Sequence, residues 1–388
     1  MLDFVGHSRA EFNYVDRFRA LVGRTSMSIK EEVEKDFPHL PLGCRIQLEE
    51  KAKTYILENI SGYINGFRKS HIIRAIQQFE STHGQPLTLT AFLKLTHVPL
   101  EKLYNGTTWN DLLYQAGIQK QTSSLNIELS RAVNKKWLST DSYSYFSFIH
   151  QLASKQFAVP ASMLTEKEQK LALMLYYDLY EVAGKFTSLQ ALFDRLHQDA
   201  IFIHEVTELT ALLMEQCNAL EKDDNSILRD VLPLKLHGVY TRSQIQVAIG
   251  TSTLIKKSTS REGCERTTLR GVPTEAMFVD IIKNREEGSN TNYNDFAQSS
   301  QKFHWETQNR VSPLSPTGQK YINQTQTMLL FVRKQARAAD NPYRTMGYVY
   351  LGEVTLESYQ GSRPMQIVWN LKAPMPGEVY EYAMKYAI

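Results

Sequence analysis

The segment from Phe303 to Tyr321 gathers hydrogen-bonding side chains around one indole, in the order FHWETQNRVSPLSPTGQKY. Aromatic rings stack on nucleobases, at about 1–3 kcal/mol per base, and amides, hydroxyls and arginines bind base edges and phosphates. Apolar, strand-like runs flank this segment, and loops held between strands often carry binding groups. These residue types predict a base-binding site made of His304, Trp305, Gln308, Asn309, Arg310, Ser312, Tyr321 and, from a later turn, Arg363.

Several of these side chains fit a structural role equally well. Trp305 follows Phe303 by two residues, so both lie on one face of a strand, and the indole suits a core as well as a pocket. His304 then points to the opposite face and can satisfy a turn. Arg363, in GSRP, can brace its loop through backbone carbonyls. Both interpretations of each residue remain open at this point.

Two more aromatic residues are candidate neighbours of Trp305 in such a pocket. They are Trp369 and Tyr343, although Trp369 alternates with Ile367 and is expected in the core. Two Ser-Pro steps stiffen the segment, which suits a preformed site and an inert surface connection equally.

A second chemistry to consider is metal-dependent cleavage of phosphodiesters, which would use carboxylates beside a lysine. The candidates for it are Asp280, Lys283, Glu286, Glu287 and Asp295. Acidic residues beside lysines are common on surfaces, and residues three apart face opposite sides of a strand. His197 and His204 also lack a zinc-binding spacing. We therefore expect no metal and no cofactor, and keep the nuclease as an alternative.

Short strands must position the residues of the 303–321 segment. Runs rich in β-branched and aromatic residues follow one another in the second half of the chain, separated by Gly, Asn, Pro and Ser. One helix, TRSQIQVAIG, opens this part, with Thr241 as N-cap and Gly250 as its stop. About five strands with one or two helices suit a small, partly closed barrel. The runs are AMFVDIIKN, TMLLFVRKQ, MGYVYLGEV and MQIVWNLKA, within a predicted domain of residues 227–388.

From Met1 to about Lys222 the apolar periodicity is helical instead. We predict a helical segment over 1–66, a helix-turn-helix unit over 67–120 and a helical bundle over 121–226, where EKDDNS is a linker. The fold class is therefore α+β. The broad apolar faces between Thr165 and Lys222 suit a bundle, or, as an alternative function, a scaffold that docks a partner. The periodic runs are LEEKAKTYILENI, HIIRAIQQF, EKEQKLALMLYYDLY and VTELTALLMEQCNALEK.

Residues 67–120 parse into three short helices. The first, from His71 to Ser81, stops at Gly84; Thr88 or Thr90 caps the second; and Pro99 stands where a third begins. The segment resembles the helix-turn-helix repeat found beside homing endonucleases, which carries F…HG…PT and then GxWNxxLxxAG. The matching residues are Phe79, His83, Gly84, Pro86, Thr88, Gly106, Thr108, Trp109, Asn110, Leu113, Ala116 and Gly117.

This resemblance implies that the third helix enters a major groove. The candidate DNA contacts are Lys94, Lys102, Tyr104 and Asn105, whereas Trp109 is expected in the core. The family often has more basic residues in the third helix than this chain does. A tri-helical spacer without DNA contact is the alternative.

The second half carries another resemblance. FHWETQNRVSPLSPTGQKY, LLFVRK and GSRPMQIVWNLKAPMP, preceded by LKLHGVYTRSQIQVAIG, resemble in order the C-terminal domain of a group of bacterial superfamily-two helicases. In that group a phospholipase-D-like nuclease and a DEAD/DEAH-type ATPase precede the domain. The N-terminal LDFVGHSRAEFNYVDRFRALVG resembles the segment that follows the helicase core. The resemblance implies a PUA-like barrel, a kind of domain of which several members read modified bases.

The sequence shows no motor of its own. A GxxxxGK[ST] loop is missing, because Gly184-Lys185 is followed by Phe186, and neither a DEAH-like box nor an HxK nuclease pair occurs. We expect a non-enzymatic DNA-binding or targeting module of a helicase-nuclease protein, in DNA processing or phage defence. Its C-terminal domain would read a base, plain or modified. Its expected partners are DNA and a helicase or nuclease polypeptide.

Composition agrees with a globular protein of the cytoplasm, and the helicase resemblance implies a bacterial one. The 388 residues are 42% hydrophobic and carry a net charge of +3. From Asp230 onward 19 Lys and Arg residues face 14 Asp and Glu residues, a mild excess that favours an anionic partner. Three scattered cysteines, Cys44, Cys217 and Cys264, make no disulfide framework. We also expect no membrane span and no secretory signal.

Overall fold

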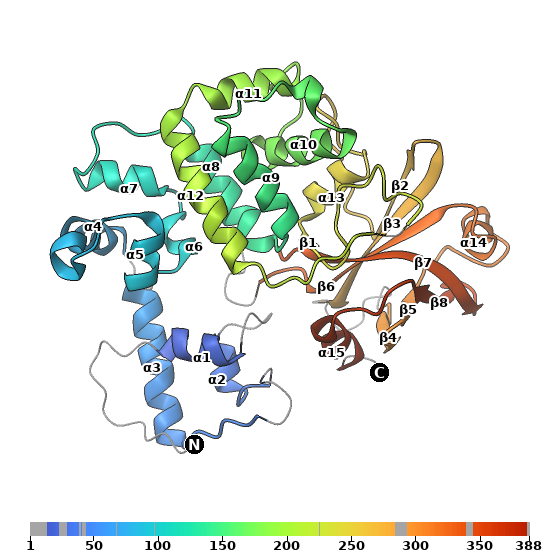
Figure 1. Cartoon of the computed structure of the whole chain (residues 1–388). Coiled ribbons are helices and arrows are strands. Elements are labelled where there is room, and N and C mark those ends of the chain that lie inside the picture. Colours follow the sequence, from blue (N-terminus) through green and yellow to red (C-terminus); the bar gives the residue numbers. More distant parts are fainter. Residues whose placement is uncertain are drawn as a thin grey trace. The chain divides into compact units, whose positions relative to one another are not determined.

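The computed structural model describes residues 14–22, 29–38, 40, 44–66, 68–96, 98–224, 226–283, 293–338 and 344–385. They divide into two compact units, one that extends to Thr122 and one that begins at Ser123. The first unit is helical, and the second combines a helical bundle with a β-sheet (Figure 1). The predicted α+β class is confirmed. Within these stretches no helix has the length and apolar character needed to cross a membrane.

Three helices open the first unit: α1 (Tyr14–Val22), α2 (Ile29–Glu34) and α3 (Glu50–Gly66). Each presents one apolar face, and these faces meet because a lone amphipathic helix is marginal in water. The small core that results contains Tyr14, Val22, Ile29, Val33, Phe37, Ile56 and Ile60.

Four short helices follow: α4 (Lys69–His83), α5 (Leu89–Thr96), α6 (Leu100–Leu103) and α7 (Trp109–Gln115). Gly84 ends α4 in the left-handed conformation at φ 64°. Thr88 caps α5, because its hydroxyl oxygen accepts a hydrogen bond from the backbone N–H of Ala91 at 3.1 Å. Both signals were readable in the sequence.

Three aromatic rings form the core of α4 to α7. The ring centroids of Phe79 and Phe92 lie 5.7 Å apart, and those of Phe92 and Trp109 lie 5.1 Å apart. Trp109 is buried, as predicted. The segment from Pro99 onward forms two short helices, because the chain turns at Gly106, with φ 71°, before Thr108 caps α7.

The second unit begins with a helical bundle. The predicted helix over Glu166–Tyr180 has these bounds in the structure. Its apolar face is buried, as is that of Ala200–Gln216, because both helices pack on the helix Tyr143–Ser154. The elements are α8 (Asn126–Lys135), η1 (Trp137–Ser139), α9 (Tyr143–Ser154), η2 (Ala161–Met163), α10 (Glu166–Tyr180), α11 (Leu189–His197) and α12 (Ala200–Gln216).

Helix α12 ends earlier than its apolar periodicity predicts. The pattern extends to Lys222, but the helix stops at Gln216. Beyond it, the Asp141 carboxylate accepts hydrogen bonds from the backbone N–H of Asn218 at 3.0 and 3.2 Å. Lys222 then pairs with Leu236 in an isolated β-bridge. These tertiary partners replace the helical hydrogen bonds, which periodicity alone does not reveal.

Eight strands form one mixed sheet within the described residues, in the order β2-β3-β6-β7-β8-β5-β4 with β1 paired to β7. Only the pair of β3 and β6 is parallel. The strand path ends at β2 and β4 and does not close, so the expected partly closed barrel is an open sheet. The strands are β1 (Val239–Tyr240), β2 (Cys264–Leu269), β3 (Val272–Ile282), β4 (Phe296–Ser299), β5 (Lys302–Glu306), β6 (Thr327–Gln335), β7 (Tyr348–Gln360) and β8 (Gln366–Leu371).

Helices cover both faces of this sheet (Figure 1). Helix α13 (Arg242–Ala248) packs on one face, where the Arg242 guanidinium lies 4.0 Å from the centre of the Phe278 ring. Thr241 and Gln244 form the capping box of α13, and Thr241 was the predicted N-cap. Helices α14 (Pro316–Ile322) and α15 (Gly377–Lys385) pack on the other face, in a core that includes Met277, Val279 and Trp369.

One buried carboxylate joins the bundle to α13. Asp178 Oδ2 accepts hydrogen bonds from the Trp137 indole at 3.0 Å, the Tyr145 hydroxyl at 2.7 Å and the Gln244 amide at 2.9 Å. Asp178 Oδ1 has no hydrogen-bond partner among the described residues. Burial raises the pKa of Asp178 to about 6, although its three donors pull it down. This polar core therefore joins the bundle to the helix that packs on the sheet.

The raised pKa of Asp178 predicts how stability depends on pH. The folded chain binds this proton more tightly than the unfolded chain, whose carboxyl titrates near 3.8. The free energy of unfolding should therefore fall by about 3 kcal/mol as pH rises from about 4 to about 6. Urea unfolding at the two pH values measures this fall in the free energy of unfolding. Asp178→Asn should abolish the part of it that comes from Asp178. Asp194→Asn, on an exposed carboxylate, is the matched control. Equal pH dependence of Asp178→Asn and wild type would contradict the assignment.

Candidate functional site

The segment from Lys302 to Ile322 is a strand, a turn and a helix rather than one loop. Ser315 Oγ accepts a hydrogen bond from the backbone N–H of Gly318 at 3.1 Å, and Pro316 is the first residue of α14. The second Ser-Pro step therefore starts a helix. A Cβ on Gly318 would lie 2.0 Å from the carbonyl oxygen of Ser312, so the turn packs on α14 only with glycine there.

Trp305 lies mostly inside the core below α14. Its side chain is 6% exposed. The ring packs edge-on against Tyr321 at 5.6 Å and is tilted against Trp369 at 6.3 Å. It is therefore not an open stacking platform on the surface, although it borders a pocket. Tyr343, its other candidate neighbour, lies outside the described residues.

His304 faces the opposite side of β5, as strand alternation predicts. Its ring stacks on Phe296 with centroids 4.6 Å apart, and Nδ1 is 2.8 Å from the carbonyl oxygen of Asn294. The side chain is 8% exposed. The structural interpretation of His304 therefore holds, and this residue is withdrawn from the base-binding set.

A pocket of about 380 Å³ lies between strand β2, the turn after β5 and helix α14; we call it the β2–α14 pocket. It gathers four of the predicted site residues, Trp305, Gln308, Arg310 and Tyr321. Ser312 is not among its lining residues. The lining is Ser260, Glu262, Cys264, Glu265, Arg266, Glu275, Trp305, Gln308, Arg310, Val311, Thr317 and Tyr321.

The buried carboxylate of Glu275 organises one side of this pocket. Glu275 Oε1 accepts a hydrogen bond from the Tyr321 hydroxyl at 2.8 Å. Glu275 Oε2 accepts from Arg266 Nε at 2.8 Å and from Gln326 Nε2 at 2.5 Å. These bonds tie the edge strand β2 and helix α14 to the neighbouring strand β3. A buried charge needs such partners, so the three donors fix the shape of the pocket.

The same carboxylate controls the groups beside it. Burial, and then the negative charge of Glu275, raise the pKa of the Cys264 thiol well above its ordinary value. Burial and the neighbouring Cys264 and Glu275 likewise raise the pKa of Tyr321. Cys264 is therefore held as a thiol and is unsuited to act as a nucleophile, which requires a thiolate.

The open side of the pocket carries an unpaired guanidinium and an amide, whereas a buried carboxylate in its lining is paired. Arg310 is exposed, and its guanidinium makes no hydrogen bond or ion pair with any residue that the structure describes. Gln308 is partly exposed beside it. Glu265 is buried, where Ser258 Oγ donates to it at 2.5 Å and Gln246 Nε2 at 2.9 Å. The pocket thus has a cationic rim and a lining rich in acceptors.

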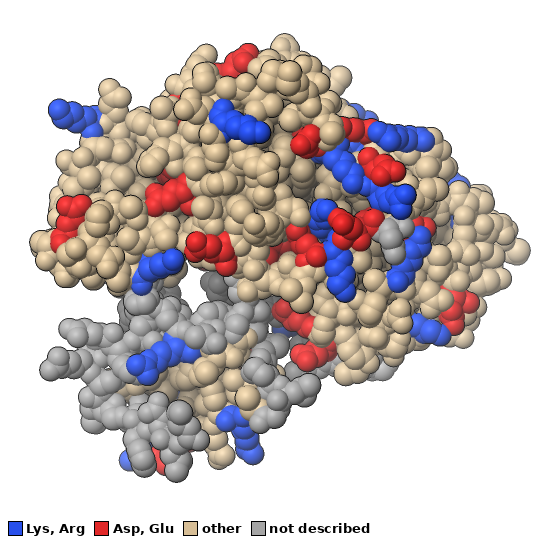
Figure 2. All heavy atoms as spheres, viewed as in Figure 1, with Lys and Arg blue, Asp and Glu red and all other residues tan. Residues whose placement is uncertain are grey.

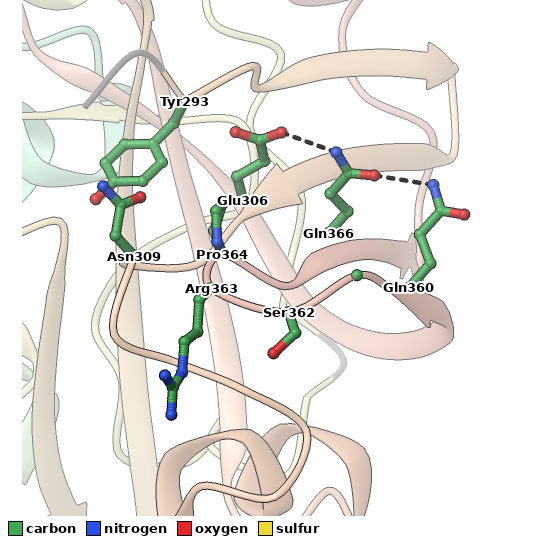
Figure 3. Close-up of a pocket in the computed structure, with 9 residues that line it drawn as sticks. Tyr293, Glu306, Asn309, Gln360, Ser362, Arg363, Pro364 and Gln366 are labelled. Carbon is green, nitrogen blue, oxygen red and sulfur yellow. Dashed lines mark hydrogen bonds between the residues drawn. The ribbon is translucent and has the colours of Figure 1, made fainter. Parts of the chain in front are cut away.

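The remaining predicted residues, Asn309 and Arg363, line a different and wider pocket of about 830 Å³, the β7–β8 hairpin pocket. In Figure 3 a chain of hydrogen bonds joins Glu306, Gln366 and Gln360, at 3.2 and 2.9 Å, while the Arg363 side chain points away from it. Backbone N–H of Arg363 donates to the carbonyl oxygen of Val311 at 3.0 Å. The predicted set therefore divides between two pockets and does not form one site.

The carboxylates proposed for a nuclease are already paired. Asp280 makes a two-armed ion pair with Arg333 at 2.7 and 3.0 Å. Lys283 Nζ lies 2.6 Å from Asp295 Oδ2. Glu286 and Glu287 lie outside the described residues. In the part of the chain described here, no group of three or more His, Cys, Asp or Glu residues is arranged to hold a metal. Among the described residues, these observations give the nuclease alternative no geometric support.

In the first unit, Tyr104 is fully buried and has no surface to offer a nucleic acid, which corrects its assignment. Lys94 on α5 and Asn105 after α6 are exposed, and Lys102 on α6 is partly exposed. Residues 68–122 contain six Lys and Arg residues and three Asp and Glu residues. The excess of positive charge suits phosphate contacts, but it is small.

On the face shown in Figure 2, Lys and Arg side chains alternate with Asp and Glu over the part of the second unit that holds α13, β2 and β3. This face carries no continuous field of one sign. Recognition there would depend on particular groups rather than on a broad basic surface.

Sequence reasoning missed Arg266, Glu275 and Cys264. One signal was available, since VPTEAMFVDII places a glutamate immediately before the apolar run AMFV. A carboxylate in such a run needs partners, which is a reason to look for a polar site. The partners themselves come from β2 and α14, which the sequence did not indicate as neighbours.

Comparison with protein families bears on this half of the chain. Residues 234–383 match the family described as "Domain of unknown function (DUF3427)". The matched region is the C-terminal part of the chain, which is similar to this family. It includes the whole sheet and α13 to α15 except the last residues of α15, and thus both pockets. A search of curated proteins found no match.

The pairing of Glu275 with its neighbours predicts the reactivity of Cys264. Glu275→Gln removes the charge that helps to raise the thiol pKa, so iodoacetamide should label Cys264 roughly threefold faster or more at pH of about 8. Peptide mass spectrometry measures the rate at each cysteine. Exposed Cys44 and partly buried Cys217 are internal controls whose rates should not change. An unchanged rate at Cys264, with both controls constant, would contradict the pairing.

Proposed function

We propose that this chain is a nucleic-acid-binding module and that the β2–α14 pocket of its DUF3427 domain receives a nucleobase, plain or modified. One observation carries the proposal. Two aromatic side chains, an amide and an unpaired guanidinium, all expected from the sequence, line one pocket of about 380 Å³. That volume lies within the range of ~300–1,000 Å³ usual for small-ligand sites.

The charges of this pocket suit a base better than a phosphate. Glu262, Glu265 and Glu275 outnumber Arg266 and Arg310 in its lining, so an anion deep inside would be repelled. Carboxylates accept hydrogen bonds from the exocyclic amino group of cytosine, and Gln308 offers both donor and acceptor atoms. Exposed Arg310 can bind the phosphate that stays outside. These groups support an orientation in which the base lies inside the pocket and the phosphate stays outside it.

The first unit adds phosphate contacts through Lys94, Lys102 and Asn105 in this proposal. The helix-turn-helix resemblance of residues 67–120 and the exposure of these side chains support it. The helicase resemblance supplies the biological setting, in which the module targets a helicase-nuclease polypeptide to DNA during DNA processing or phage defence. A docking scaffold is less well supported, because the broad apolar faces of the bundle are buried within it.

Removal of the rim guanidinium tests the pocket. Arg310→Ala should weaken binding of deoxycytidine monophosphate roughly tenfold, because a charge-assisted contact to phosphate contributes about 1.5–3 kcal/mol. Isothermal titration with each of the four mononucleotides measures this. Arg229→Ala removes another exposed guanidinium and should bind like wild type.

A second experiment distinguishes the contributions of the two units to binding. Lys94→Ala/Lys102→Ala should leave mononucleotide binding unchanged and weaken binding of a labelled DNA duplex, with a smaller dependence on salt. Absence of mononucleotide binding to wild type would overturn the base-pocket assignment. Equal duplex affinity of the double variant and wild type would remove the contribution of the first unit.

A further inference from the structure

A second charged feature of the sheet-containing unit lies where α8 and α10 end. Five cations gather there around two carboxylates, and we call this group the α8 basic patch. Four of the cations come from the bundle, outside the DUF3427 match, and one comes from the loop after α13. Its cations are Arg131, Lys135, Lys136, Lys185 and Lys257, and its carboxylates are Glu128 and Glu181.

Glu181 stands at the centre of the patch. Its carboxylate lies 3.5 Å from Lys135 Nζ, 3.5 Å from Lys136 Nζ and 3.9 Å from Arg131 Nε. Lys257 Nζ donates a hydrogen bond to its backbone carbonyl oxygen. Lys185, four residues after Glu181, pairs with Glu128 at 3.7 Å and lies above the Tyr180 ring. The patch therefore has three more positive than negative charges.

Those charges act on one another. Burial alone would raise the pKa of Glu181, but Lys136, Lys135 and Arg131 outweigh it and lower the pKa. Burial, and then the nearby Lys136 and Lys135, lower the pKa of Lys257 in spite of Glu181. One carboxylate thus pairs with several cationic side chains. These side chains lie within a Debye length of one another, so their like charges repel. An anion that settles on the patch would relieve that repulsion.

The loop from Lys257 to Glu262 connects this patch to the β2–α14 pocket. Ser260 and Glu262 line the pocket. Ser260 is the third residue after Lys257, so their Cα atoms lie at most about 11 Å apart. The loop is fixed between them, because Ser258 Oγ donates to Glu265 at 2.5 Å and Gln246 Nε2 lies 3.2 Å from the Ser260 carbonyl oxygen. Patch and pocket therefore keep a constant spacing.

We propose that the α8 basic patch binds the phosphate backbone of the nucleic-acid strand whose base occupies the β2–α14 pocket. This inference rests on the proposed function and adds the direction in which the strand leaves the pocket. A strand carries one phosphate per nucleotide, about 3.4 Å apart along a duplex axis, so phosphates within a few nucleotides reach the patch. Arg310 then holds the nearest phosphate, and the lysines hold those that follow.

Two exposed lysines of the patch allow a clean test. Lys135, with a side chain 60% exposed, and Lys257 can both be replaced by alanine without loss of a buried contact. The probe is a fluorescein-labelled single strand of about 20 nucleotides, longer than a usual single-domain site. Lys135→Ala/Lys257→Ala should lower its affinity roughly tenfold. It should also reduce the slope of log K against log salt by about 1.4, or ~0.7 per lost phosphate contact.

Two controls make the outcome specific. Lys155→Ala/Lys167→Ala removes the same charge elsewhere on the bundle and should bind like wild type. Deoxycytidine monophosphate, which reaches only the pocket, should bind the patch variant as it binds wild type. If the long strand binds wild type but its affinity and salt slope do not change in the patch variant, the patch inference is wrong and the pocket proposal stands. If wild type binds neither probe, both proposals fail.

Discussion

The candidate site depends on a carboxylate that the fold buries completely. Glu275 sits in strand β3, between β2 and β6, where an ionised side chain costs several kcal/mol unless donors surround it. Arg266, Tyr321 and Gln326 are those donors, and they come from strand β2, helix α14 and the segment before β6. Because their bonds converge on one group, the edge strand and the helix hold a fixed separation. The space between them is the β2–α14 pocket, and its position in the region that matches DUF3427 follows from that constraint.

A second buried carboxylate makes the bundle part of the same structure. Asp178 accepts from the bundle residues Trp137 and Tyr145 and from Gln244 of α13, which packs on the face of the sheet opposite α14. The family match begins at residue 234, yet this polar core extends across that boundary. The helices that precede the matched domain therefore support its sheet. They also bring Lys135 and Lys136 within reach of the loop that borders the pocket.

Local signals in the sequence predicted much of the fold. The N-cap at Thr241, the glycine stop at Gly84, the helix over Glu166–Tyr180 and the strand over Thr327–Gln335 all have the expected positions. What failed depended on partners distant in the sequence. Helix α12 ends near the point where the Asp141 carboxylate accepts a hydrogen bond from the backbone N–H of Asn218. The 303–321 segment is part strand and part helix, because β8 pairs with its first residues and Ser315 caps α14.

The candidate site shows the same division between local and distant information. Residue types identified Trp305, Gln308, Arg310 and Tyr321, which do share a pocket. They did not identify Glu275 or Arg266, whose roles arise only when β2 pairs with β3. They also grouped Asn309, a close neighbour in the chain, and Arg363, from a later turn, with residues of a different pocket, because residue type does not show which pocket a side chain lines. Tyr104 and His304 are polar in sequence but enclosed in the fold.

Entry of a base into the β2–α14 pocket is the central claim, and photochemical cross-linking tests it most directly. An oligonucleotide that carries 5-iododeoxyuridine, irradiated with the protein and digested, reports by mass spectrometry which residue touches the base. The account predicts a cross-link on Trp305 or Tyr321, which border the pocket from β5 and α14. Cross-links confined to the β7–β8 hairpin, or to surfaces away from both residues, would contradict it.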